Sequence, residues 1–328
     1  MLLLNGDEVR KALPVREAYR VVAEVMRRYS AGDVVLPVRT VLAAGDGSLF
    51  GAMPCHVTGE SDSGYGLKAV LHAPGNTARG LPTHVGVVVV FDPDTAQPLA
   101  MMEAGAVTAL RTAAASAVAT DALALPDAGD LALIGAGTQA RSHLLALSEI
   151  RRLRRVRFWN RGSARAEEFL TWARAQLDVD ITLMNTPAEA LRGADLVCTT
   201  VNTTDPVVCA DDLAEGVHLN AVGSSVPGKR ELSSDAVASC SVFVDTREGA
   251  QQESSELAAP VEEGLTPADR RLTEIGEVLL GNHPGRSGPA ERTLYKSLGM
   301  AAQDVASGFA IVRAARRLGL GITTDFTC

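Results

Sequence analysis

The sequence lacks the cysteine and histidine patterns that hold metal ions or build disulfide frameworks. Its six histidines form no HxH or HExxH arrangement and its five cysteines form no CxxC pair, so we expect no zinc site. An odd number of cysteines without a secretory signal is typical of reduced thiols, and we predict a cytoplasmic protein. The cysteines are Cys55, Cys198, Cys209, Cys240 and Cys328.

An excess of positive charge and a membrane-spanning segment are also missing. The formal net charge is −8, which argues against a general nucleic-acid-binding protein but leaves room for a local basic pocket. The opening stretch MLLLNGDEVRK turns charged too soon for a signal peptide or a membrane span. The longest run of small residues, 104–125, is interrupted by Arg111 and Asp121, and we expect a buried helix of a globular protein there.

The composition favours a globular protein of two domains. Hydrophobic residues make up 46% of the chain and charged residues 21%, which excludes wholesale disorder. At 328 residues the chain is longer than one hydrophobic core usually serves. We find no internal repeat and no low-complexity linker.

The two parts of the chain differ in their pattern of predicted elements. Strands follow one another closely before residue 120, which predicts an antiparallel or mixed sheet. After it, short apolar strands alternate with helices, which predicts a doubly wound parallel sheet. We expect a last helix at about 297–318 to return to the first domain. The early strands are VRTVLAA (38–44), SLFGAMP (48–54), YGLKAVL (65–71) and HVGVVVVF (84–91). The later strands are 131–134, 156–159, 181–183, 195–201, 218–222 and 242–245.

Helix boundary signals mark the segment TPAEALRG, 186–193. Thr186 can cap the helix, Pro187 suits its first position, and Glu189 can close a capping box. The polar stretch 250–264 is either a loop or an exposed helix.

A glycine-rich turn lies between the first strand of the second part and the helix that follows it. Gly135 permits a tight turn, Gly137 lets the backbone approach a pyrophosphate, and Ala140 suits the contact between helix and strand. The phosphates would lie at the helix N-terminus. A plain tight turn can carry the same pattern, but the strands and helices around it favour a dinucleotide. The residues of the turn are Gly135, Ala136, Gly137, Thr138, Gln139 and Ala140.

The end of the second strand, FWNRGSAR at 158–165, lacks the acidic residue that usually holds the ribose of NAD. Asn160 can donate a hydrogen bond and Arg161 can pair with a 2′-phosphate, with Ser163 and Arg165 nearby. We therefore predict a preference for NADP(H), with NAD(H) possible. The alternative is that Arg161 is a solvated arginine at a helix start.

Three cations stand in apolar or small-residue segments of the first part: Arg39, Lys68 and Arg111. A buried cation needs an anion. That anion could be a structural Asp or Glu, or it could be the carboxylate of a substrate, and spacing alone does not decide between them.

Several long motifs resemble the ornithine cyclodeaminase/μ-crystallin family over nearly the whole chain. They are the stretch 65–124, which begins YGLKAVLHAPGN, and IGAGTQA, LNAVGSSVPGKREL, VFVDTRE and SLGMAAQDVASG. The resemblance implies a homodimer and a discontinuous α+β dimerisation and substrate domain, residues 1–120 plus 305–328, with an inserted Rossmann domain at 121–304.

The resemblance also implies roles for single residues. Arg39, Lys68 and Arg111 match positions that surround the substrate carboxyl group, and Thr83 and Asp304 match positions near the cofactor or the cleft. Lys68 is then a candidate for proton transfer, because a lysine buried beside two arginines should have a depressed pKa.

The chain departs from the cyclodeaminases at Ser225, where they carry an aspartate that handles the substrate amine. Ketimine-reductase-like members resemble this chain in having a serine there and WNR after the second strand. A serine can hydrogen-bond an imine or orient a water, although Ser225 could instead satisfy backbone groups in a tight loop.

These observations predict an NADPH-dependent reductase of a small imine or ketimine that bears an α-carboxylate. The alternatives are a cyclodeaminase of ornithine or lysine that uses NAD, an alanine-dehydrogenase-like oxidoreductase, and a low-turnover NADPH- or ligand-binding protein. We expect the partners to be the imine or amino acid and a second copy of the chain, with no nucleic acid and no membrane.

Overall fold

The computed structural model describes residues 1–59 and 62–326, which divide into two compact units. Unit 1 is Met1–Arg111 with Met300–Cys328, and unit 2 is Thr112–Gly299. The domain boundaries expected from the sequence lie after residues 120 and 304, which would place Asp304 in the second domain. In the structure Asp304 belongs to unit 1. Cys328 lies outside the described residues.

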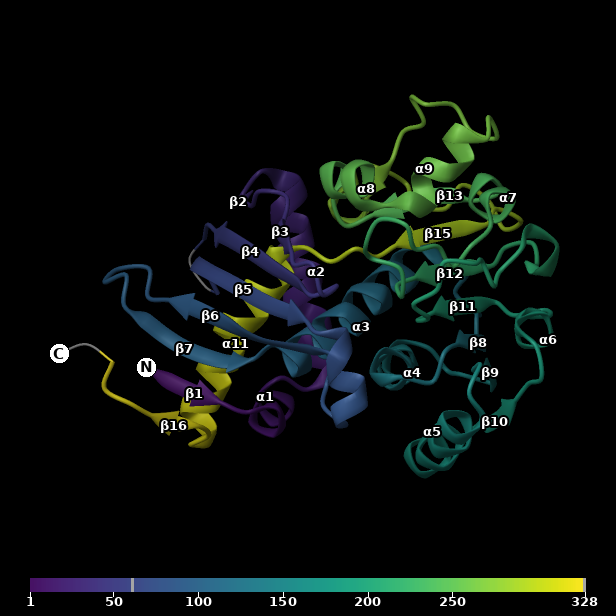
Figure 1. The fold of residues 1–328 in the computed structure, drawn as a ribbon. Helices are drawn as coiled ribbons and strands as arrows, with labels where there is room; N and C mark the ends of the chain where they lie inside the picture. The colour runs from purple at the N-terminus through teal and green to yellow at the C-terminus, as the bar shows by residue number, and fades with distance from the viewer. Residues whose placement is uncertain (60–61, 327–328) are drawn as a thin grey trace. The chain divides into compact units, whose positions relative to one another are not determined.

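Unit 1 is built on a mixed sheet with the described strand order β16-β1-β7-β6-β5-β4-β2 and with β3 also paired to β4 (Figure 1). β1 runs parallel to β7, whereas β4, β5, β6 and β7 pair antiparallel. The four early strands predicted from the sequence correspond to β3 to β6, and the prediction of an antiparallel or mixed sheet is confirmed. The strands are β1 (Leu2–Leu4), β2 (Val34–Val35), β3 (Thr40–Ala43), β4 (Leu49–Val57), β5 (Gly64–His72), β6 (His84–Phe91), β7 (Pro98–Glu103) and β16 (Ile322–Thr323).

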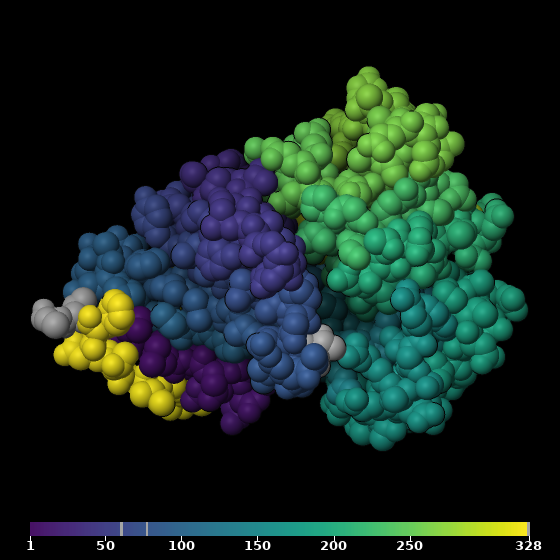
Figure 2. Space-filling view, in the orientation of Figure 1, coloured from purple at the N-terminus to yellow at the C-terminus, as the bar shows by residue number. Residues whose placement is uncertain are grey.

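The helix α11 (Ala301–Leu318) crosses one face of this sheet, beside α1 (Gly6–Ala12) and α2 (Val15–Ala31) (Figure 1). Its approach is close, since a Cβ on Gly66 of β5 would lie 2.6 Å from Val305. The last helix therefore returns to the first domain as expected, although it begins at Ala301 and not near 297. The N-terminal strand β1 pairs with β16, a late strand of the chain, purple against yellow in Figure 2.

Unit 2 contains a parallel sheet with the described strand order β10-β9-β8-β11-β12-β15-β13-β14 (Figure 1). β8 to β13 correspond to the six strands predicted from the sequence, and the chain winds outward from β8 in both directions, which confirms the doubly wound sheet. The strands are β8 (Asp130–Ile134), β9 (Arg155–Trp159), β10 (Asp180–Leu183), β11 (Leu196–Thr199), β12 (His218–Ala221), β13 (Ser241–Val244), β14 (Thr273–Glu274) and β15 (Thr293–Lys296).

β15, which was not predicted from the sequence, lies between β12 and β13 with all four residues buried. Its four residues, TLYK, are too few to show a periodicity, and they follow a stretch rich in glycine, proline and serine. Their position in the sheet depends on strands that end about fifty and seventy residues earlier in the chain, which local pattern does not encode.

Helices flank the parallel sheet, and three of them correct or complete the predictions. Thr186 caps α6, but Glu189 accepts from the N–H of Asn185, so the predicted capping box does not close on Thr186 itself. The polar stretch 250–264 forms most of two short helices and buries Glu256. The helices are α4 (Thr138–Ile150), α5 (Ser163–Gln176), α6 (Pro187–Leu191), α7 (Ser234–Ala238), α8 (Arg247–Glu253), α9 (Ser255–Glu262) and α10 (Ile275–Leu279).

The run of small residues forms α3 (Ala104–Leu123), which contains the boundary between the units and is buried along most of its length. Among the described residues, no helix combines the length and apolar character needed to cross a bilayer.

Candidate active site

The glycine-rich turn connects β8 directly to α4. Gly135 has φ +118°, a left-handed conformation, and a Cβ there would lie 2.5 Å from Thr200 Oγ1. Its N–H donates to the carbonyl of Trp159 at 2.8 Å. Glycine is therefore required at residue 135 for two reasons, the backbone conformation and the close approach of the loop after β11.

The N-terminus of α4 fits a dinucleotide phosphate. Gly137 occupies the cap position without a side-chain cap, and a Cβ built on it meets no atom within 4 Å. Ala136 and Ala140 are buried, Thr138 is exposed, and Gln139 keeps a buried Oε1 that finds no partner in the described chain. Free N–H groups beside an open glycine are the donor set that a pyrophosphate needs.

The segment after β9 leads into α5, whose cap residue is a glycine without a side-chain cap. Asn160 is half-buried and donates from Nδ2 to the carbonyl of Gly162 at 2.9 Å. Arg161, Ser163 and Arg165 are exposed.

In unit 1 two buried cations share a single carboxylate. Lys68 Nζ lies 2.7 Å from Asp304 Oδ2, and Arg111 Nε lies 3.0 Å from Asp304 Oδ1. Arg111 also donates from Nη1 to Gln303 Oε1 at 2.9 Å. β5 supplies the lysine, α3 the arginine, and the first turn of α11 the aspartate. A structural anion is therefore present, but two cations on one carboxylate leave one positive charge in excess.

Burial lowers the pKa of Lys68 to about 8, against the opposing effect of Asp304 and with further lowering by Arg111 and Arg39. The depressed pKa expected from the sequence is found, but desolvation outweighs the two arginines as its cause. The two cations in turn hold the pKa of Asp304 below its usual value despite complete burial. The group that can change protonation near neutral pH is thus the lysine.

Arg39 is half-buried just before β3, close enough to act on Lys68 through its charge. Thr83 precedes β6, and its Oγ1 lies 3.2 Å from Nδ1 of His84. Ser225 lies half-buried in the loop after β12 of unit 2, and its hydroxyl makes no hydrogen bond to the described residues.

The sequence model of the ornithine cyclodeaminase/mu-crystallin family matches residues 1–316. The chain belongs to this family. A Δ1-pyrroline-2-carboxylate reductase of Bacillus cereus is 33% identical over 99% of this chain and 100% of its own length.

Solved structures of family members match over the full length. The Δ1-pyrroline-2-carboxylate reductase of Thermococcus litoralis, in complex with NADH and L-proline, has a TM-score of 0.94 at 31% identity, covering 99% of this chain and 100% of that one. An archaeal alanine dehydrogenase, a dimer with bound NAD, has a TM-score of 0.92 at 32% identity, covering 100% and 99%. The α/β fold with a Rossmann-like sheet is thus that of the family.

Unit 2 contains a buried charged cluster that was not predicted from the sequence, formed by Glu231, Glu256 and Lys296. Lys296 Nζ lies 2.6 Å from Glu256 Oε2, with side chains 0% and 1% exposed. Glu231 is equally buried. Glu231 is part of the motif LNAVGSSVPGKREL, where it directly follows Lys229 and Arg230, so no local signal set it apart from an exposed charged turn.

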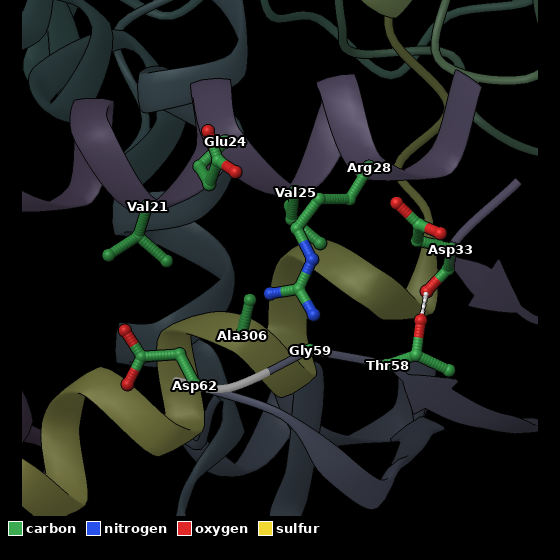
Figure 3. A pocket seen from close by; sticks show the side chains of 9 residues that line it. All are labelled: Val21, Glu24, Val25, Arg28, Asp33, Thr58, Gly59, Asp62 and Ala306. Carbon is green, nitrogen blue, oxygen red and sulfur yellow. Dashed lines mark hydrogen bonds between the residues drawn. The ribbon is translucent and has the colours of Figure 1, made fainter. Parts of the chain in front are cut away.

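A pocket of about 400 Å³ opens in unit 1 between α2, α11 and the segments around Thr58 and Asp62 (Figure 3). Its lining includes three carboxylates, of Glu24, Asp33 and Asp62, against the single guanidinium of Arg28. The balance of charge makes this pocket a poor site for a carboxylate substrate, and no residue of the cation cluster lines it.

Proposed function

We propose that this protein reduces the C=N bond of a small imino acid that bears an α-carboxylate. The observation that carries the proposal is the sharing of Asp304 by Lys68 and Arg111, which leaves an excess positive charge and a lysine with a pKa of about 8 in one buried cluster. The relatives named for reduction of Δ1-pyrroline-2-carboxylate support the same chemistry.

The carboxylate of the substrate binds to the excess positive charge. The described hydrogen bonds of Arg111 use Nε and Nη1, which leaves Nη2 for a carboxylate oxygen. Arg39 contributes a second guanidinium. Asp304 holds Lys68 and Arg111 in place, and it also keeps their combined charge low enough for burial.

Reduction of C=N adds a hydride to the carbon and a proton to the nitrogen. A bound reduced nicotinamide supplies the hydride. Lys68 holds the proton, since with a pKa of about 8 it is protonated at neutral pH and acidic enough to protonate a developing amine. Ser225, whose hydroxyl is uncommitted within the described chain, orients the imine or a water.

For the cofactor we propose NADP(H) over NAD(H). The exposed Arg161 and Arg165 next to the uncapped start of α5 support a 2′-phosphate site, and no carboxylate stands at residue 160. The related structures contain NADH or NAD, which favours the non-phosphorylated cofactor. Comparison of kcat/KM for NADPH and NADH decides, and a clear preference for NADH rejects this assignment.

A homodimer and a cytoplasmic location complete the proposal. The sheet face of unit 1 opposite α11 presents exposed apolar side chains, among them Leu71 and Val85, which are partners in the β5–β6 register and are 42% and 50% exposed. A second copy of the chain would cover this face. Leu71→Glu should then yield monomers by light scattering. The location stays a prediction from the cysteine content.

The test is loss of NADPH or NADH absorbance with Δ1-pyrroline-2-carboxylate and Δ1-piperideine-2-carboxylate. Turnover supports the reductase. Consumption of reduced cofactor only with pyruvate and ammonia would instead support an alanine dehydrogenase, which the archaeal relative makes the second candidate. Ammonia release from ornithine or lysine with catalytic NAD would support a cyclodeaminase. Cofactor binding without turnover of any of these substrates would support the alternative of an NADPH- or ligand-binding protein.

A further inference from the structure

The buried cluster of unit 2 holds two loops at the carboxyl edge of the parallel sheet. Glu231 Oε1 accepts the N–H of Val201, just after β11, at 2.8 Å. Glu231 Oε2 accepts the N–H groups of Gly223 and Ser224, just after β12, at 2.7 and 3.3 Å. One carboxylate thus joins the ends of two neighbouring strands, at the edge where doubly wound sheets bind their ligands.

Lys296 and Glu256 make further hydrogen bonds to the backbone around Ser224 and Glu231. Lys296 Nζ donates to the carbonyl of Ser224 at 2.7 Å, and Glu256 Oε1 accepts the N–H groups of Glu231 and Leu232 at 2.6 and 2.7 Å. Ser224 is therefore fixed at its N–H by Glu231 and at its carbonyl by Lys296. Because that carbonyl lies in the planar peptide that leads to Ser225, the cluster fixes the positions of the amide nitrogen and Cα of Ser225.

The same carboxylate connects to the dinucleotide turn. Val201 follows Thr200, whose Oγ1 donates to the carbonyl of Ile134 at 3.2 Å and packs against Gly135. Three fully buried charged side chains are expensive to maintain for packing alone, since apolar residues of similar volume would serve as well. The hydrogen bonds of Glu231 and Lys296 converge on the backbone of Val201, Gly223 and Ser224, whereas Glu256 holds the backbone of Glu231 itself.

We propose that Glu231, supported by Glu256 and Lys296, is the positioning residue that holds Ser225 and the loop after β11 in the arrangement needed for imine reduction. The proposal rests on the proposed function, because it gives Ser225 a role in the reaction. Glu231 touches neither substrate nor cofactor in this scheme and acts through the backbone.

The hydrogen bonds that Glu231 accepts from the two loops depend on its charge state and therefore on pH. Burial and the charge of Glu256 raise the pKa of Glu231 to about 7, against Lys296 and the backbone N–H groups. A further ionisable neighbour is the thiol of Cys198, whose own pKa is raised well above its usual value, so that it stays neutral. As pH falls through 7 the carboxylate gains a proton and loses an acceptor site. Turnover should therefore decline on the acid side near pH 7.

The decisive variant is Glu231→Gln. We expect kcat to fall roughly tenfold to a hundredfold, the cost of a reacting group misplaced by about 1 Å, with the acid limb abolished and dinucleotide affinity changed less than about threefold. In a Ser225→Ala background the same substitution should have little further effect on kcat. Hydrogen exchange should accelerate at the amides of Val201, Gly223 and Ser224, which is a readout independent of activity.

The matched control is Asp195→Asn. Asp195 Oδ2 also accepts two backbone N–H groups, of Gly129 and Asp130 at 3.0 and 3.1 Å, but at the opposite end of β8. This variant should lose stability and keep kcat and the pH profile. Should Glu231→Gln fail to fold, Glu256→Gln replaces it, and the acid limb should move to lower pH because a neighbouring negative charge is gone.

Each result has one meaning. A wild-type chain inactive on imino acids overturns the proposed function. An active wild-type chain in which Glu231→Gln behaves like Asp195→Asn overturns the positioning role alone. The positioning role is also overturned if Glu231→Gln lowers kcat by the same factor in the wild-type and the Ser225→Ala backgrounds. Unchanged hydrogen exchange at the amides of Val201, Gly223 and Ser224 would overturn it as well.

Discussion

Asp304 Oδ2 lies 2.7 Å from Nζ of Lys68, and the two side chains are 0% and 5% exposed. The other oxygen of the same carboxylate holds Arg111. One anion thus keeps two cations buried while neutralising only one of them. Removal of either cation leaves a balanced pair, whereas removal of the anion leaves two unpaired charges, and the predictions for these residues follow from this asymmetry.

Lys68→Ala and Arg111→Ala should each impair turnover while the protein stays folded. Loss of the proton donor should lower kcat by roughly 10²–10⁴-fold. Loss of the guanidinium should raise KM by roughly ten- to a hundredfold, the worth of a charge-assisted hydrogen bond. Steady-state kinetics measure both, and the NADPH Kd from fluorescence should stay within about twofold. Full activity of both variants would show that the substrate carboxylate binds elsewhere.

The pH profile of reduction should fall as pH rises through about 8, where Lys68 loses its proton. Asp304→Asn removes the charge that raises this pKa, so the falling limb of kcat should move to lower pH. Arg111→Met removes a charge that lowers it, and the limb should move to higher pH. A limb that stays in place in both variants would assign the titration to another group.

Asp304→Asn should also destabilise unit 1. Removal of one partner from a buried ion pair costs about 3–5 kcal/mol, which urea unfolding can measure. Because the pKa of Asp304 is lowered from 3.8, its contribution is complete above that pH and is lost as pH falls below it. The difference in the free energy of unfolding between the wild type and Asp304→Asn should therefore become smaller in acid. Glu168→Gln, which breaks the exposed pair with Arg141, is the control and should change stability little.

The two glycines of the dinucleotide turn should respond differently to added side chains. Gly135→Ala should lower Tm, because the Cβ would meet Thr200 and the backbone is left-handed. Gly137→Val should leave Tm nearly unchanged, since the space beside Gly137 is open and its φ is −88°, yet it should abolish dinucleotide binding. Calorimetry and NADPH titration separate the two effects. Normal NADPH affinity in Gly137→Val would mean that the phosphates bind elsewhere.

Cofactor choice should depend on two residues after β9. Arg161→Ala should lower kcat/KM for NADPH by roughly tenfold to a hundredfold and leave NADH unaffected, as loss of one charge-assisted hydrogen bond predicts. Asn160→Asp should also lower kcat/KM for NADPH, because a carboxylate repels a 2′-phosphate. The ratio of kcat/KM values should then shift in favour of NADH. Equal changes with both cofactors would show that neither residue contacts the 2′ position.

The strands and the dinucleotide turn could be predicted from the sequence because their signals are local. Alternating apolar segments specify strands within a few residues, and the order of strand, glycine-rich turn and helix marks the dinucleotide turn. Family motifs identified Arg39, Lys68, Arg111 and Asp304 as candidates, one residue at a time. The sequence by itself thus determined the central strands of both sheets, the dinucleotide turn and which side chains carry charge.

Tertiary structure alone decided which of these charges meet. Arg111 and Asp304 are 193 residues apart, and only the packing of α11 on the sheet of unit 1 brings one carboxylate to both cations. The insertion of β15 between β12 and β13 likewise delivers Lys296 to Glu256 and to the Ser224 carbonyl. Backbone periodicity is encoded over a few residues, whereas the partner of a buried charge depends on the whole fold, so no local pattern could have specified these clusters.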